Sequence, residues 1–188
     1  MVARLPWGNR DDDRRRHVRD SAQHHRDARP GAAARIGSEA VSERVPAEFD
    51  DFLAEPHNAI LCIPRDAEEG AGQDAPHATP VWFDYSGGRF RISITRRRVK
   101  YRLLQEAPRV TLVIDDAPTY RTVVVSGPAE ILDDDDSLLD LRARLYAKYR
   151  RDFGESGQQE AQLLRSLREE GRVVVAITPE QVLSWAGA

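Results

Sequence analysis

The sequence contains very little sulfur. It has one cysteine, Cys62, and one methionine in 188 residues. A single cysteine excludes an intramolecular disulfide and excludes a zinc site built from several cysteines. Cys62 lies within the apolar segment 58–63, where a cysteine is expected to pack as a small buried residue and not to act as a nucleophile.

Long apolar runs and several common catalytic motifs are also missing. No run approaches the 18 or so apolar residues of a membrane-spanning helix, and no apolar segment near the N-terminus resembles a signal peptide. We therefore expect a cytoplasmic protein without a membrane partner. The chain has no G-x-G-x-x-G motif, no Walker loop and no G-x-S-x-G motif, so neither a Rossmann or P-loop nucleotide site nor a serine hydrolase is indicated.

The N-terminal part of the chain differs in composition from the rest. Residues 1–44 mix acidic and basic residues densely and show almost no apolar periodicity, so they are predicted to form a disordered charged extension. Residues 45–188 are predicted to form one domain. This domain has more acidic than basic residues, which argues against a nucleic-acid partner.

Two groups of residues have side chains that can bind metals, but each has a simpler explanation. His24 and His25 lie in the charged extension, where solvated side chains are expected. The four aspartates at 133–136 precede an apolar helical pattern, and carboxylates are favoured at a helix N-terminus because they complement its partial positive charge. We predict no metal site.

The stretch from Thr79 to Arg109 organises the sequence. Residues 81–85 alternate between two unlike faces, as a strand does, and Ser86-Gly87-Gly88 is typical of a tight hairpin. Residues 89–95 alternate again. Thr95 is a plausible N-cap of a helix that carries Val99, Leu103 and Leu104 inward and ends before Pro108.

The other elements follow from the same patterns. The Gly127-Pro128 pair indicates a bend within a strand, and Thr178-Pro179 with Gln181 predicts a capping box at the start of a helix. Roughly six strands at hairpin spacing predict a small antiparallel barrel. We expect helices at 45–54, 137–150 and 158–170 (capped by Ser156), strands at 58–63, 109–115, 120–132 and 172–177, and a polar loop at 65–75.

Basic residues crowd the predicted start of the helix after Thr95. Arg96, Arg97, Arg98 and Lys100 have the wrong sign for a helix N-terminus, where each misplaced cation costs roughly 0.3–1 kcal/mol. A bound phosphate would reverse this penalty, because helix N-termini bind anions. The alternative is a solvated basic face, and we favour the phosphate interpretation.

The same stretch resembles a known family. H-A-T-P-V-W-F-D-Y-S-G-G-R-F, followed by I-S-I-T-R-R-R-V-K-Y-R-L-L and A-P-R-V-T-L-V-I-D-D, is similar to the flavin/deazaflavin-binding split-barrel proteins. Within that family it resembles the pyridoxamine 5'-phosphate oxidase-like, probable coenzyme F420-dependent enzymes. The likeness extends from about Phe49 to Ser184. It implies a mainly β fold with flanking helices, an FMN-binding split β-barrel, in a homodimer with the cofactor at the subunit interface.

The resemblance also implies a binding site. The cofactor phosphate would lie at Arg98, Val99 and Lys100, and its ring along residues 79–82. Arg96 and Arg97 would suit the negative charges on the oligoglutamyl tail of F420. Trp185 is included because the family also places residues of the partner chain in the cofactor site. The implied cofactor-binding residues are Thr79, Pro80, Val81, Trp82, Ser93, Thr95, Arg96, Arg97, Arg98, Val99, Lys100 and Trp185.

Three functions fit this resemblance. The first is an F420-dependent oxidoreductase that transfers hydride between the reduced deazaflavin and a small unsaturated or aromatic substrate. The second is an FMN-dependent oxidase or reductase, and the third is a non-catalytic F420 carrier. Tyr101 and Tyr120 lie near the implied site in sequence, but no catalytic residue is assigned.

Overall fold

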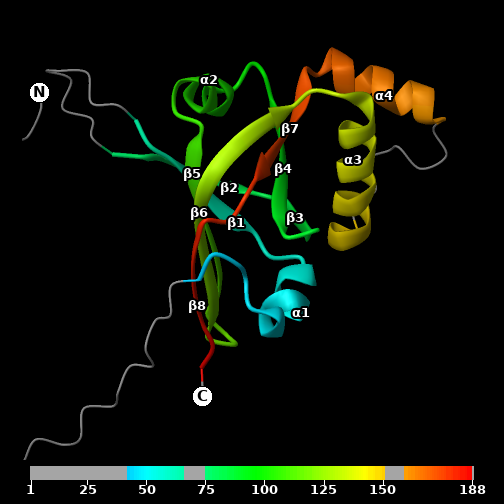
Figure 1. Ribbon diagram of the computed structural model, residues 1–188. Coiled ribbons are helices and arrows are strands. Elements are labelled where there is room, and N and C mark those ends of the chain that lie inside the picture. The colour runs from blue at the N-terminus through cyan, green and yellow to red at the C-terminus, as the bar shows by residue number, and fades with distance from the viewer. Residues whose placement is uncertain (1–41, 66–74, 151–158, 188) are drawn as a thin grey trace, which may run out of the picture. The chain divides into compact units, whose positions relative to one another are not determined.

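The computed structural model describes residues 42–65, 75–150 and 159–187. These residues form one curled sheet with short helices around it (Figure 1). Most of the predicted extension at 1–44, most of the loop at 65–75 and the Ser156 cap lie outside the described residues, but Ser42 pairs with Val182 of the last strand. The strands are β1 (Ala59–Ile63), β2 (His77–Val81), β3 (Phe83–Ser86), β4 (Arg89–Thr95), β5 (Arg109–Asp116), β6 (Arg121–Leu132), β7 (Arg172–Ile177) and β8 (Gln181–Trp185).

The order of the strands forces the sheet to curl. Neighbouring strands follow the order β2-β1-β5-β6-β7-β4-β3, and β8 also pairs with β6. β2 and β3 therefore lie at opposite ends of this order, yet only Trp82 separates them in the chain. A flat sheet would hold these two strands far apart. The sheet must roll until its ends meet, which produces the predicted barrel, with eight strands in place of six.

The predicted alternation is confirmed along the hairpin strands. Phe90, Ile92 and Ile94 of β4 are buried in the barrel core, while the residues between them are half-buried. Gly87 and Gly88 form the turn between β3 and β4 with φ values of 59° and 75°, which glycine adopts without a steric penalty.

Two of the helices cover one side of the barrel (Figure 1). In β7, Val173, Val175 and Ile177 face the core, whereas Val174 packs beneath two helices that follow β6 and precede β7. This explains why β7 is an almost continuous apolar run. The helices are the 3₁₀ helix η1 (Ala47–Phe49), α1 (Asp50–Ala54), α2 (Val99–Glu106), α3 (Asp135–Tyr149) and α4 (Glu160–Glu169). In the described part of the chain, no helix combines the length and the apolar character needed to cross a membrane.

The aspartates before α3 have the structural role that the sequence indicates. The Asp134 side chain accepts a hydrogen bond from the Ser137 backbone N–H and caps the helix. Asp133 and Asp135 form ion pairs with Arg168 of α4. Among the described residues, no group of histidine, cysteine or carboxylate side chains is arranged to hold a metal ion.

The strand β6 joins the two halves of the sheet. One edge pairs with β5, while the other pairs with β8 over residues 122–126 and with β7 over residues 129–132. Gly127 lies where these two partners meet, and a Cβ built on Gly127 would be only 1.9 Å from the Thr178 carbonyl oxygen. The bend predicted at Gly127-Pro128 lies at the point where the partner of β6 changes from β8 to β7.

The predicted capping box at Thr178 is wrong. The residues after Pro179 form β8, a strand paired with β6, and not a helix. Backbone N–H groups of Thr178 and Glu180 donate to the carbonyls of Pro128 and Ser126, so β6 fixes this segment on both sides of Pro179. Pairing with a neighbouring strand therefore overrides the local helix signal.

The start of α2 also differs from the prediction. Thr95 is the last residue of β4, and the N-cap of α2 is Arg98, whose side chain makes no capping hydrogen bond. Arg96 and Arg97 lie in the intervening turn. Leu103 and Leu104 are buried as predicted, but Val99 is 46% exposed, because the later start turns the first residue of the helix outward.

Two smaller predictions need correction. The segment 81–85 is not one strand, since Trp82 interrupts it and its two parts pair with different neighbours. Within β3, Phe83 and Asp84 are both buried, so the alternation expected of two unlike faces is absent there. Cys62 is half-buried and not fully buried, because it lies on the outer face of β1, away from the core side occupied by Leu61 and Ile63.

Candidate functional site

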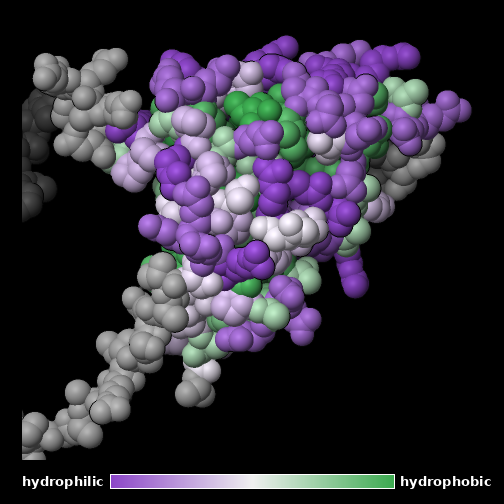
Figure 2. All heavy atoms as spheres, in the orientation of Figure 1, coloured by the Kyte–Doolittle hydropathy of each residue, from purple (hydrophilic) through white to green (hydrophobic). Residues whose placement is uncertain are grey.

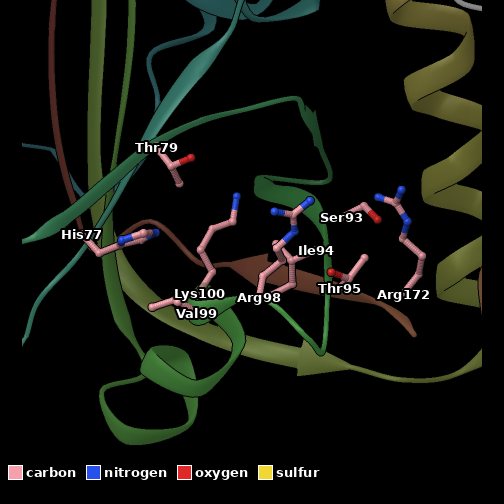
Figure 3. Close-up of a pocket in the computed structure, with 9 residues that line it drawn as sticks. All are labelled: His77, Thr79, Ser93, Ile94, Thr95, Arg98, Val99, Lys100 and Arg172. Atoms are coloured by element: carbon pink, nitrogen blue, oxygen red, sulfur yellow. The ribbon is translucent and has the colours of Figure 1, made fainter. Parts of the chain in front are cut away.

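A pocket of about 370 Å³ opens between the two ends of the sheet. β2 forms one side, β4 and β7 form the other, and the first turn of α2 lies between them (Figure 3). In the space-filling view, the face seen in Figure 2 is largely hydrophilic around a small hydrophobic area between the positions of α2 and α4. The pocket residues are His77, Thr79, Ser93, Ile94, Thr95, Arg98, Val99, Lys100 and Arg172.

The pocket concentrates positive charge. Arg98, Lys100 and Arg172 line it, and none of its lining residues is a carboxylate. Within the described residues, Arg98 and Lys100 form no ion pair, whereas Arg172 pairs with Glu170 at 2.7 Å. The first backbone N–H groups of α2 add partial positive charge at the same place, because a helix start leaves them without intrahelical acceptors.

Holding these cations close together is electrostatically unfavourable. Burial, and then the neighbouring charge of Arg98, lower the pKa of Lys100 below its usual value. α2 also has no acidic residue in its first turn that would offset this charge. A bound anion would relieve both effects, so the residues present fit a phosphate group.

The remaining lining residues supply hydrogen-bonding groups. Thr79, Ser93 and Thr95 contribute hydroxyls, which can either donate or accept. His77 contributes an imidazole whose Nδ1 lies 3.4 Å from Nη2 of Arg65. Burial lowers the pKa of His77, with smaller contributions from the charges of Arg65 and Lys100.

The structure brings together only part of the predicted binding set. The lining residues that the sequence indicated are Thr79, Ser93, Thr95, Arg98, Val99 and Lys100. Arg96 points elsewhere, since it forms an ion pair with Asp133 and donates a hydrogen bond to the Tyr101 hydroxyl. Arg97 is exposed in the turn before α2.

The predicted ring-binding segment after Thr79 also lies outside the pocket lining. Pro80 is exposed, Val81 is buried in the core, and Trp82 stacks on Tyr149 with ring centroids 4.5 Å apart. Trp185 is 39% exposed at the end of β8, opposite Thr122 of β6. In this chain it does not line the pocket, and its contribution from a partner chain stays a prediction.

Sequence reasoning missed three lining residues. His77 had a local signal, because it is two positions before Thr79 and therefore on the same face of the strand. Ile94 belongs to the core face of β4. Arg172 pairs in register with Thr95, a contact between residues far apart in the sequence that only the folded sheet reveals.

A second group of charged residues lies under α3, outside the pocket. Arg91 bridges Asp84 at 2.8 Å and Asp140 of α3 at 2.6 Å. Lys148 donates to the carbonyl oxygens of Leu53 and Phe83 at 2.7 and 3.0 Å. Burial lowers the pKa of Lys148 to about 8, and the nearby Asp84 opposes this effect. These contacts fasten α3 to the barrel and serve a structural role.

The fold places the protein among the split β-barrels, because one antiparallel sheet rolls up until its first and last strands meet. A family model described as pyridoxamine 5'-phosphate oxidase matches residues 45–186. The chain belongs to this family. No curated protein sequence matches the chain.

Solved structures have the same fold. An F420 reductase is 24% identical, covers 73% of this chain and 98% of its own, and gives a TM-score of 0.55. A conserved hypothetical protein from Mycobacterium tuberculosis is 22% identical. The match covers 77% of this chain and 88% of that protein, with a TM-score of 0.60. An FAD-binding protein from Mesorhizobium loti is 17% identical, with coverages of 79% and 99% and a TM-score of 0.51.

Proposed function

We propose that the protein is an oxidoreductase that holds the phosphate of a deazaflavin, coenzyme F420, in this pocket. The observation that carries the proposal is the convergence of Arg98, Lys100 and the start of α2 in a pocket without a lining carboxylate. When bound, the cofactor supplies the hydride chemistry. The chain supplies binding and orientation, through the cations and hydroxyls that line the pocket.

The choice between F420 and FMN rests on charge. Arg172, which pairs with Glu170, is a third cation beyond the pair at the helix start that a ligand with more than one negative group could engage. The F420 reductase with this fold supports the same choice. An FMN-dependent oxidase or reductase is the second candidate, since one phosphate satisfies Arg98 and Lys100, and an FAD-binding protein also has this fold.

Titration of the purified protein with F420 and with FMN, at one fixed salt concentration, tests the proposal. Tight F420 binding with weak FMN binding supports the deazaflavin assignment, and the reverse supports the FMN-dependent function. Reduction of enones or quinones by the reduced cofactor then tests the proposed class of small unsaturated or aromatic substrates. Binding of F420 without turnover of any substrate indicates a carrier.

Removing the two cations at the helix start should abolish cofactor binding. In the double variant Arg98→Ala/Lys100→Ala we expect affinity to fall by roughly 100-fold or more, because each hydrogen bond to a charged group contributes about 1.5–3 kcal/mol. The fold should persist, since the change relieves repulsion between the cations. Arg102→Ala/Arg109→Ala removes the same charge from exposed positions outside the pocket lining and should bind normally. Equal affinity in the two double variants would contradict the phosphate site.

We also propose that two copies associate through the outer face of the sheet. Ile60 pairs with Pro80 on one side and Val113 on the other, and Val113 continues the row to Val124 and Leu183. Ile60 is 39% exposed, although it has apolar neighbours on both sides in this row. Apolar surface of this kind favours a self-complementary contact between identical subunits.

A charge within this row should prevent dimerisation. We expect Ile60→Glu to elute as a monomer at micromolar concentration, while the unaltered protein forms a dimer by light scattering. Gln105→Glu adds a charge at an exposed position of α2 and should leave the dimer intact. A monomeric unaltered protein would overturn this proposal.

A further inference from the structure

His77 is the pocket residue whose charge can change near neutral pH. The other ionisable groups that line the pocket are Arg98, Lys100 and Arg172, which are basic. An imidazole has an ordinary pKa of about 6.5 and is the usual side chain to titrate in this range. His77 therefore controls how the charge of the pocket varies with pH.

The contacts of His77 define its neutral form. The guanidinium of Arg65 can only donate hydrogen bonds, so Nδ1 of His77, 3.4 Å away, acts as the acceptor. The proton of the neutral ring is therefore assigned to Nε2. Figure 3 shows the ring extending from β2 toward the Lys100 side chain, into the space that the cations surround.

Among the described residues, the charges that lower the pKa of His77 are those of Arg65 and Lys100, and the other charged residues lining the pocket are also basic. Arg65 follows β1, Lys100 and Arg98 come from the start of α2, and Arg172 comes from β7. β4 contributes only hydroxyls and the apolar Ile94 to the lining, and Ile63 of β1 is the residue opposite His77. Among the described residues, no carboxylate lines the pocket to offset these cations, so the empty pocket keeps His77 neutral at pH 7.

An anion in the pocket reverses this balance. We infer that His77 binds the pocket's anionic group through Nε2 and takes up a proton from solvent at Nδ1 when that group binds, giving up the Nδ1 contact with Arg65, so that anion affinity increases as pH falls. The inference rests on the proposed function, because it concerns the same pocket. It assigns a binding role to a residue outside the phosphate contacts at the start of α2.

The direction of the pH effect follows from linkage. The pKa of His77 lies below its usual value in the free pocket and rises when a negative charge binds beside it. Affinity is therefore lowest above the bound-state pKa, increases as pH falls, and levels off below the free-state pKa. Each unit by which binding raises the pKa increases affinity tenfold.

Sulfate is a suitable probe, because its charge stays constant between pH 5 and pH 8, unlike that of a phosphate monoester. We expect the affinity of the full-length protein for sulfate to increase about tenfold over this range, for a pKa change of about one unit. His77→Gln keeps a neutral donor and should bind sulfate with little pH dependence. His57→Gln alters a histidine outside the pocket lining and should keep the full pH response.

A direct measurement complements the binding curves. The ring signals of His77, assigned in NMR spectra by their absence from His77→Gln, should give a higher pKa in the presence of sulfate than in its absence. The same pH response in His77→Gln, or an unchanged His77 pKa, would overturn the inference and leave the proposed function standing. Failure of the unaltered protein to bind sulfate at any of these pH values would overturn both.

Discussion

Gly127→Ala is expected to destabilise the protein by about 3 kcal/mol or more, near the upper end of the cost of inserting atoms into a packed site. The added Cβ would lie 1.9 Å from the Thr178 carbonyl oxygen, far inside van der Waals contact. Thr178 cannot move away freely, because its own N–H donates to Pro128. The substitution therefore forces β6 apart from the segment between β7 and β8.

Thermal unfolding of Gly127→Ala measures this effect. A loss of about 3 kcal/mol corresponds to a decrease in Tm of roughly 10 °C for a domain of this size. Gly87→Ala is the matched comparison, because a Cβ there meets open space and the cost comes only from its φ of +59°. We expect about 1 kcal/mol for Gly87→Ala. Similar losses in the two variants would show that the close approach at Gly127 is not a constraint.

Arg91→Leu is expected to destabilise the protein by about 3 kcal/mol, because it removes the direct ion-pair partner of a buried carboxylate and leaves Asp84 only the more distant charge of Lys148. Asp84 is only 8% exposed. Without Arg91, its carboxylate would lose the hydrogen bond from the guanidinium and keep the one from the Ser86 hydroxyl. The change also releases Asp140, and with it one of the contacts that hold α3 against the sheet.

Chemical denaturation of two further variants separates these effects. Arg89→Leu removes a neighbouring arginine whose partner Glu130 is exposed, and such a pair contributes no more than about 1 kcal/mol. Adding Asp84→Asn to Arg91→Leu should recover part of the lost stability, because the unpaired buried charge is then absent. A double variant no more stable than Arg91→Leu would place the whole loss in the contact with α3.

The sequence predicted elements well where the signal is local. The hairpin at Gly87-Gly88, the alternation of β4 and the aspartates at the start of α3 each depend on residues within a few positions of one another, and all three are confirmed. The segment after Thr178 could not be predicted in this way, because its local pattern suits a helix. Its structure depends on β6, some fifty residues earlier in the chain.

The candidate site likewise contains residues that local sequence patterns reveal and residues that only the folded sheet brings to the pocket. Cations crowding the predicted start of a helix marked this region, and the family resemblance implied Arg98, Val99 and Lys100 as the phosphate site. The structure places all three residues at the pocket. Arg172 reaches the pocket only because β7 pairs with β4 in a particular register. Arg96 was nominated for its charge, but Asp133, which comes much later in the sequence, pairs with it.

The single-residue connection at Trp82 has a consequence for the dynamics of the site. β2 carries His77 and Thr79, and it is an end strand that pairs only with β1. Trp82 connects the C-terminal end of β2 to β3, and its ring stacks on Tyr149 of α3. Separation of β2 from β1 would dismantle one wall of the pocket without unfolding the core, and such local openings cost less than global unfolding. Ligand affinity is thereby coupled to the local stability of β2, and a bound ligand should slow amide hydrogen exchange along that strand.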